Sequence, residues 1–166
     1  MKKYELLEND KVQCCGRTLR RVRALINIGT SVLAGDLGGY IEGEHNLDNT
    51  GDTASWVSGD AKVSGNARVS GNARIFGNAW VSGNAWVSGN AWVSGNAVIF
   101  GNAWFSGNAW VSGKARVSGN AGVFGNARVS GKARVSGYVG IFGYADRKST
   151  RLNSSHEIPS RMPSSA

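Results

Sequence analysis

The sequence predicts an all-β chain that winds into a parallel β-solenoid of triangular cross-section, and three observations lead to this prediction. A six-residue unit, most purely G-N-A-W-V-S, repeats from Ala61 to Ser136 with almost no slippage, and a fixed short period is typical of solenoid proteins. One position of each unit is apolar, and the position two residues earlier is small. A Gly, usually followed by Asn, separates successive units. Three six-residue sides close one coil, so the fifteen apolar positions make about five coils.

The apolar column and the small column are expected to form the core. The apolar column consists of Val57, Val63, Val69, Ile75, Val81, Val87, Val93, Ile99, Phe105, Val111, Val117, Val123, Val129, Val135 and Ile141. The small column runs from Ala61 through Ala133 and is broken at Val139. Because side chains alternate along a strand, residues two positions apart point to the same side. We therefore expect a narrow core of stacked branched and small side chains.

The Gly-Asn pairs are expected to form the corners. Gly tolerates a positive φ, and Asn is among the few other residues that enter the left-handed region at low cost. We therefore expect both residues to serve the backbone geometry of a tight corner. Phe76, Phe100 and Phe124 recur every 24 residues, which we interpret as a trace of gene duplication.

Residues 1–52 lie outside the repeat and are predicted to form a small N-terminal β cap. Strands are expected at residues 3–7 and 12–15 around a turn, and again at 18–28. An open solenoid end exposes unpaired strand groups that must be covered, which gives this segment its expected role. Adjacent cysteines rarely bridge each other, so Cys14 and Cys15 are expected to be buried small hydrophobic residues.

The six-residue repeat is absent from residues 146–166. Residues 146–166 resemble a translated short-read sequencing adapter, residue by residue, and are interpreted as a non-native disordered tail. The predicted units are therefore a cap at 1–52, a solenoid at 53–145 and this tail. On that interpretation the chain is truncated inside or just after its repeats.

The V-S-G-N-A-x unit resembles the bacterial-transferase hexapeptide motif over roughly Trp56 to Ala145. That resemblance implies a left-handed parallel β-helix that often forms trimers of the type known from acyltransferases. The strings R-x-R-A-L and A-G-D-L-G-G-Y-I-E resemble the leader of uncharacterised bacterial and prophage hexapeptide-repeat proteins, some of which carry an acyltransferase label. Unrelated functions share one scaffold, so the resemblance speaks to fold more than to activity.

The residues for catalysis are missing from the repeat array. Hexapeptide acyltransferases generally depend on a histidine as general base, whereas the array holds no histidine, no cysteine and one carboxylate, Asp60. His45 precedes the coils in a polar loop, where a passive role is expected. No cluster has metal-ligand spacing, so we expect no catalytic residue, no metal and no cofactor. The alternative is an acyltransferase-like enzyme whose catalytic residues lie in a missing C-terminal part.

The outward column, which precedes each apolar position, contains all six tryptophans. Coils of 18 residues place Trp86 under Trp104 and Trp92 under Trp110, with Arg68, Arg74 and Arg128 beside tryptophans. The candidate binding residues are Trp80, Trp86, Trp92, Trp104, Trp110, Arg74, Arg116 and Arg128.

Two interpretations of this column remain open. In one, the ladders of Trp and Arg only stabilise strand stacking. In the other, they form a docking surface for a second copy, another protein or a glycan. Single-stranded nucleic acid suits interleaved aromatic and basic residues, but without a recognised nucleic-acid module it is not expected.

Composition adds weak bounds on partners and location. The net charge is +8, and the array from Gly59 to Ser136 holds eight bases and one acid, a balance that favours acidic partners in a nonspecific way. No secretory signal and no apolar run of membrane-spanning length is visible, so we expect a cytoplasmic protein with no membrane partner. The sequence as a whole predicts a non-catalytic structural or interaction module. The resemblance implies an association with prophages and a homotrimer through the solenoid faces.

Overall fold

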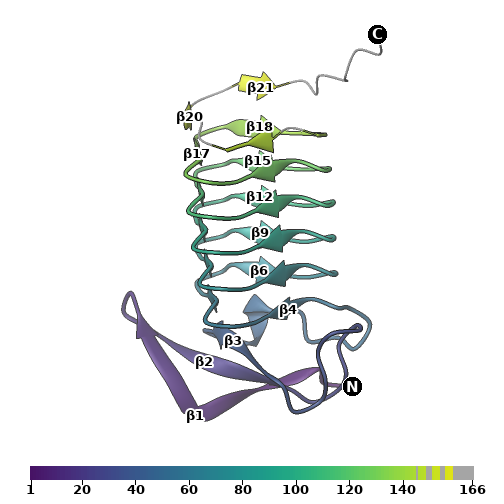
Figure 1. Cartoon of the computed structure of the whole chain (residues 1–166). Helices are drawn as coiled ribbons and strands as arrows, with labels where there is room; N and C mark the ends of the chain where they lie inside the picture. The colour runs from purple at the N-terminus through teal and green to yellow at the C-terminus, as the bar shows by residue number, and fades with distance from the viewer. Residues whose placement is uncertain (145, 149–150, 154–155, 159–166) are drawn as a thin grey trace.

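The computed structural model describes residues 1–144, 146–148, 151–153 and 156–158. Figure 1 shows a column of stacked coils above a small N-terminal cap. The described residues form an all-β parallel solenoid of about six turns with a single short helix, η1 (Glu44–Asn46). The predicted fold class is therefore confirmed.

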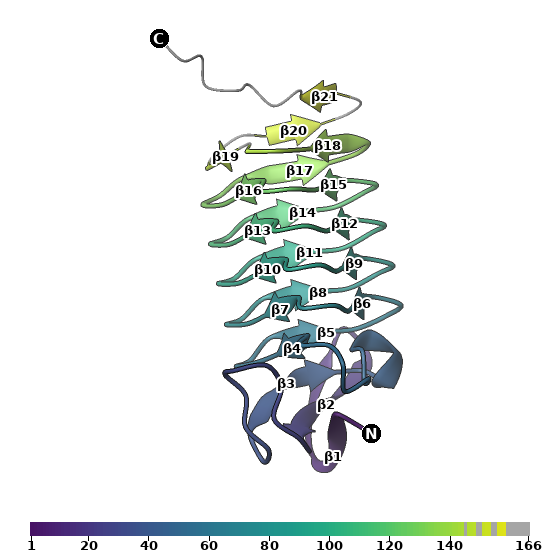
Figure 2. The ribbon, with the colours of Figure 1, turned by 90° about the vertical axis from the view of Figure 1, so that its right-hand side faces the viewer.

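Each coil contributes one short strand to each of three sheets, which we call faces 1, 2 and 3. Face 1 begins with β1 (Tyr4–Cys14), β2 (Arg17–Ala24) and β3 (Leu37–Ile41) of the cap and continues through β5 (Lys62–Val63), β8 (Trp80–Val81), β11 (Val98–Ile99), β14 (Arg116–Val117), β17 (Arg134–Ser136) and β20 (Arg151–Asn153). Face 2 contains β4 (Trp56–Val57), β7 (Arg74–Ile75), β10 (Trp92–Val93), β13 (Trp110–Val111), β16 (Arg128–Val129) and β19 (Asp146–Arg147). Face 3 contains β6 (Arg68–Val69), β9 (Trp86–Val87), β12 (Trp104–Phe105), β15 (Gly122–Val123), β18 (Val139–Ile141) and β21 (His156–Ile158). Figure 2 shows the strands of each face in one vertical row.

The register places residues 18 apart beside each other, as the triangular coil requires. Trp92 pairs with Trp110, and Val93 with Val111. The predicted core columns are buried along the whole array, including Phe105, which replaces the usual aliphatic residue at its level. The core is therefore a dry stack of branched side chains and alanines, which contributes most of the apolar burial.

The coiling begins earlier in the chain than residue 53. Strand β3 runs parallel to β5 and places Ile41 beside Val63. Leu47 then forms a parallel bridge with Val69. These two buried residues add levels below the first predicted one, and β19, β20 and β21 add one level to each face above the last. Together they account for about six turns where the sequence predicts about five.

The corners use glycine and asparagine differently from expectation. The N–H of Ala61 bonds the carbonyl of Ser58 at 3.4 Å, which closes a four-residue turn with Gly59 and Asp60 at its centre. The corner glycines all have a positive φ, whereas Cys15 is the one non-glycine residue with a positive φ in the described part of the chain. A turn of type II′ needs a positive φ only at its first central residue. The prediction that the corner asparagines take left-handed backbone is therefore wrong.

Stacking gives the corner glycines a second constraint. A Cβ atom on Gly101 would lie 2.8 Å from the backbone nitrogen of Gly119 in the coil above. Each corner is also hydrogen-bonded to the next, as where the N–H of Asn84 donates to the carbonyl of Gly101 at 2.8 Å. The repeat thus requires glycine at each corner for two reasons, the positive φ and the close approach of two backbones.

The cap hairpin differs in detail from the predicted strands. Strand β1 is continuous, and the expected turn at residues 8–11 is instead an irregularity in its pairing with β2, between Leu6 and Lys11. The chain reverses at Cys15 and Gly16, both at positive φ, as in a two-residue type I′ turn. Cys15 is therefore exposed at the tip and Cys14 is half-buried, so the prediction of buried cysteines is wrong.

The start of β1 is anchored by a buried lysine. Lys3 is fully buried, and its Nζ donates to the hydroxyls of Thr53 and Ser55, both at 3.0 Å. Burial lowers the pKa of Lys3 to about 8, an effect that the nearby charge of Asp48 opposes. Asn49 Oδ1 accepts the backbone N–H groups of Lys3 and Tyr4. The N-terminal strand is thus tied to residues 49–55 by specific polar side chains.

The segment predicted as a non-native disordered tail contributes three short strands. Strands β19, β20 and β21 pair in parallel with β16, β17 and β18. Of residues 146–166, the residues 149–150, 154–155 and 159–166 lie outside the described part of the chain. Its interpretation as a translated adapter stays a prediction.

Candidate interaction surfaces

The predicted site residues lie on all three faces of the solenoid. Face 1 carries Trp80 and Arg116, face 2 carries Arg74, Trp92, Trp110 and Arg128, and face 3 carries Trp86 and Trp104. They therefore make three separate surfaces, each with its own composition.

Face 3 carries an unbroken line of aromatic rings. Trp86 and Trp104 stack with their centroids 5.6 Å apart and an interplanar angle of 5°. Trp104 meets Phe124 edge-on at 5.9 Å, and Phe124 stacks on Phe142 at 5.2 Å. Trp86, Trp104 and Phe142 are 46%, 50% and 42% exposed. We call these four residues the aromatic line.

Two glycines make the upper half of the aromatic line possible. Gly122 and Gly140 occupy the outward positions where Trp86 and Trp104 stand lower down. A Cβ on Gly122 would lie 2.2 Å from the ring of Phe124, and one on Gly140 would lie 2.3 Å from the ring of Phe142. Each phenylalanine ring therefore lies over its glycine and fills the place of the missing tryptophan. Sequence reasoning followed the outward column alone and missed Phe124 and Phe142, although the motif G-x-F marks both positions.

The aromatic line stands on an uncharged surface. From β9 to β18, the outward residues of face 3 are Trp86, Ser88, Trp104, Ser106, Gly122, Phe124, Gly140 and Phe142. Faces 1 and 2 carry arginines over the same coils, Arg116 and Arg134 on the first and Arg128 on the second. Aromatic enrichment with depletion of charge is the composition of interface cores.

Face 2 mixes aromatic and basic residues. Trp92 meets Trp110 at 5.8 Å and 62°, and Phe76 meets Trp92 edge-on at 5.8 Å. Arg128 lies over the Trp110 ring at 5.1 Å, a cation–π contact of about 0.5–1 kcal/mol when exposed. Arg74 is the register partner of Trp92, as the 18-residue coil predicts, and donates to the Ser31 hydroxyl at 2.5 Å.

One tryptophan of the outward column is not exposed. Trp56 is 3% exposed and meets the Tyr4 ring edge-on at 6.4 Å. The cap covers it, because Gly38 brings its backbone against the Trp56 ring and the Val57 carbonyl. The outward column is thus a surface feature only above the cap.

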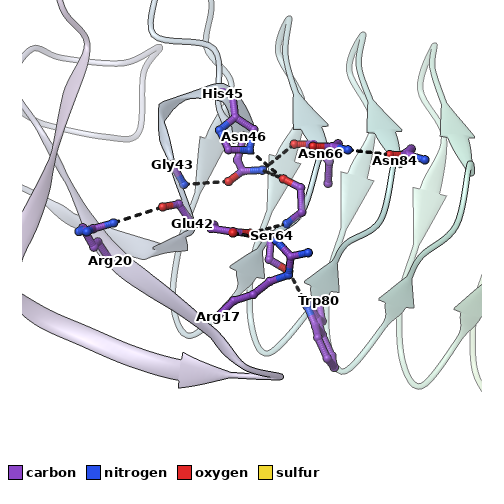
Figure 3. A network of polar contacts seen from close by, with 12 residues as sticks. Arg17, Arg20, Glu42, Gly43, His45, Asn46, Ser64, Asn66, Trp80 and Asn84 are labelled. Carbon is purple, nitrogen blue, oxygen red and sulfur yellow. Dashed lines mark hydrogen bonds and ion pairs between the residues drawn. The ribbon is translucent and has the colours of Figure 1, made fainter.

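The junction between cap and coil is held by a polar network (Figure 3). Asn46 is fully buried, and its Nδ2 donates to the carbonyls of Gly65 at 2.9 Å and Ala67 at 2.8 Å. Glu42 accepts the N–H of Gly65 at 2.7 Å. Higher in the solenoid the equivalent carbonyls accept N–H groups of the neighbouring coil, as those of Gly101 and Ala85 do. Below Gly65 the chain forms η1 in place of a regular corner, and side chains bond these groups instead.

His45 and Arg17 complete this junction. His45 Nε2 lies 2.8 Å from the Gly65 carbonyl oxygen, which gives the ring a structural partner. Arg17 Nη1 donates to both carboxylate oxygens of Glu42, at 2.7 and 2.8 Å. Partial burial raises the pKa of Glu42, but the Gly65 N–H and Arg17 outweigh it, and the net shift is downward. Sequence reasoning missed Asn46 and Glu42, since nothing in their local pattern marks a capping role.

The described residues contain no group of three or more His, Cys, Asp or Glu side chains placed to hold a metal ion. In the same part of the chain, no helix is long and apolar enough to cross a membrane.

The repeat matches one family model. The model of the YdcK beta solenoid repeat matches residues 61–74, 67–83, 73–89, 79–95 and 121–137. No curated protein matches the chain. The resemblance to hexapeptide transferases stays a prediction. The matched repeats and the strand pairing together identify the chain as a β-solenoid repeat protein.

Proposed function

We propose that this protein is a non-catalytic interaction module whose copies associate through face 3. The observation that carries the proposal is the aromatic line of Trp86, Trp104, Phe124 and Phe142, half-exposed on a surface without charge. Contiguous exposed apolar patches mark interaction sites in soluble proteins. A homotrimer, which the resemblance to hexapeptide proteins implies, is the assembly we expect, and a structural role of this kind suits a prophage setting.

Charge supports a copy of the same chain as the partner on face 3. The chain has a net charge of +8, so two copies repel each other wherever basic surfaces meet. Face 3 from β9 to β18 is neutral, whereas the same coils of faces 1 and 2 carry arginines. Copies that meet through face 3 therefore bury their aromatic rings and keep their arginines apart.

The competing interpretation is that the rings only stabilise the stacking of coils. Cross-strand aromatic pairs contribute roughly 0.2–1 kcal/mol each, and such a contribution applies equally to the tryptophan pair on face 2. A comparison of the two faces therefore separates the interpretations. Tryptophan pairs stack on both faces, but only face 3 has no charged outward residue from β9 to β18.

The test is the oligomeric state of matched double variants. Light scattering coupled to size exclusion, over a range of protein concentrations, measures the mass of the wild type, Trp86→Ser/Trp104→Ser and Trp92→Ser/Trp110→Ser. We expect a concentration-dependent oligomer for the wild type and the face 2 variant, and a monomer for the face 3 variant. A monomeric wild type, or equal behaviour of the two variants, contradicts the proposal.

A further inference from the structure

The three corners of the solenoid differ in how their side chains are bonded. At two corners the asparagine amides form ladders in which each Nδ2 donates to the Oδ1 one coil above. The first ladder joins Asn66, Asn84, Asn102 and Asn120, and the second joins Asn72, Asn90, Asn108 and Asn126. These amides are saturated by one another along the stack.

The third corner, between face 2 and face 1, is different. Its column reads Asp60, Asn78, Asn96, Lys114 and Lys132. Within the described residues, the side chains of Asn78, Asn96, Lys114 and Lys132 make no hydrogen bond or ion pair, and all four are exposed. We call these four residues the open corner.

Arginines extend the charge of the open corner onto face 1. Arg116 and Arg134 are register partners in β14 and β17, and each lies two residues beyond a lysine of the corner. Four cations therefore stand on two adjacent coils. Every ion pair among the described residues lies in the cap, so no carboxylate of the described coils neutralises them.

This arrangement is unfavourable for the isolated protein. Adjacent coils are about 4.8 Å apart, and like charges that face each other across strands are destabilising. A bound anion that runs along the corner removes this repulsion. The free amides of Asn78 and Asn96 continue the same line downward and offer donors and acceptors that suit hydroxyl groups.

We infer that the open corner binds a linear acidic polysaccharide that lies along the solenoid axis. Its carboxylates or sulfates contact Lys114, Lys132 and the flanking arginines, and its hydroxyls bond Asn78 and Asn96. Single-stranded nucleic acid fits less well because it needs free aromatic faces for base stacking. Beside this corner, the Trp110 ring has Arg128 over its face and Trp92 against it. Phe100 on face 1 is a single ring, 38% exposed, whereas successive bases need successive stacking platforms.

The experiment uses the whole chain and defined probes. Calorimetry or fluorescence anisotropy measures binding of a heparin octasaccharide, an oligogalacturonate, oligo(dT) and anionic vesicles at 50 and 200 mM salt. We expect one of the two acidic oligosaccharides to bind more tightly than oligo(dT) or vesicles. Its affinity should fall on the order of 10²-fold between the two salt concentrations, as for about four neutralised charges.

Matched variants locate the site. Lys114→Asn/Lys132→Asn restores asparagine at the corner and should reduce the affinity at least about 10-fold, with an unchanged far-ultraviolet spectrum. Lys11→Asn/Arg68→Asn removes the same charge away from the open corner and should change the affinity less than about 2-fold. Equal losses in the two variants, no binding at 50 mM salt, or tighter binding of oligo(dT) or vesicles overturns the inference. The proposed association through face 3 is tested by the mass of the protein in solution, so its outcome is independent of this binding experiment.

Discussion

The cap and the coils satisfy the same backbone groups in two different ways. In the coils each corner and strand finds its partner by translation, because the next coil presents the same group 18 residues later. In the cap, strands β1 to β3 pair with one another, but at the junction with the first coil particular side chains meet the backbone groups, such as Asn46 at the Gly65 and Ala67 carbonyls. All described ion pairs also lie in the cap. In the coils, hydrogen bonds between repeated backbone groups thus do what side-chain hydrogen bonds and ion pairs do at the cap, where the repeat ends.

The largest expected effect comes from a substitution that disturbs the stacking of one coil on the next. Gly101→Ala should lower the free energy of unfolding by about 3 kcal/mol, because it adds left-handed strain and a Cβ 2.8 Å from the Gly119 backbone. Gly16→Ala in the cap turn should lower it by about 1 kcal/mol, since nothing lies within 4 Å of the added atom. Urea unfolding followed by circular dichroism measures both. Equal losses would show that close stacking does not constrain the corner.

The next effect concerns the buried lysine of the cap. Because the pKa of Lys3 falls to about 8 in the folded chain, against about 10.4 when unfolded, the unfolded state binds more protons between these values. Stability therefore rises with pH over that window, by on the order of 1–3 kcal/mol. Lys3→Met should remove this rise.

The measurement is urea unfolding of the wild type and Lys3→Met at pH 7.5, 9 and 10. Their difference isolates Lys3 from Tyr4, whose pKa is raised by burial and by Glu44 and Asp48, and which therefore lowers stability above pH 10. Parallel pH profiles of the two proteins would contradict the assignment.

The smallest expected effect comes from a comparison of two arginines. Arg17 forms an ion pair, and Arg116 forms none with the described residues. Arg17→Ala removes a two-oxygen contact with Glu42 and should reduce stability by about 0.5–1 kcal/mol at low salt, with less effect at 1 M salt. Arg116→Ala relieves the repulsion from Arg134 and should leave stability unchanged or raise it by a few tenths of a kcal/mol. Thermal unfolding of both variants at low salt and at 1 M salt measures these changes in stability. A loss for Arg116→Ala equal to that for Arg17→Ala would show that coil charges are compensated after all.

The coils were predictable from sequence because each residue type recurs in one environment. The 18-residue stack of Trp92 on Trp110 followed directly from the period. The cap was less predictable, since its strands, the turn at Cys15 and the role of Asn46 depend on contacts between residues far apart in the chain. The aromatic line was only half visible, because Phe124 and Phe142 reach into a neighbouring column over glycines.

The step of 24 residues between Phe76, Phe100 and Phe124 has a geometric consequence. It equals one coil plus one side, so these residues lie on faces 2, 1 and 3 in turn, each one coil higher. An insertion or deletion of one hexapeptide preserves the core, yet it moves every later outward residue to the adjoining face. Only changes by whole coils, in multiples of 18 residues, keep each later outward residue on its own face. Length variation in such a chain can therefore create or erase a neutral face while the fold stays the same.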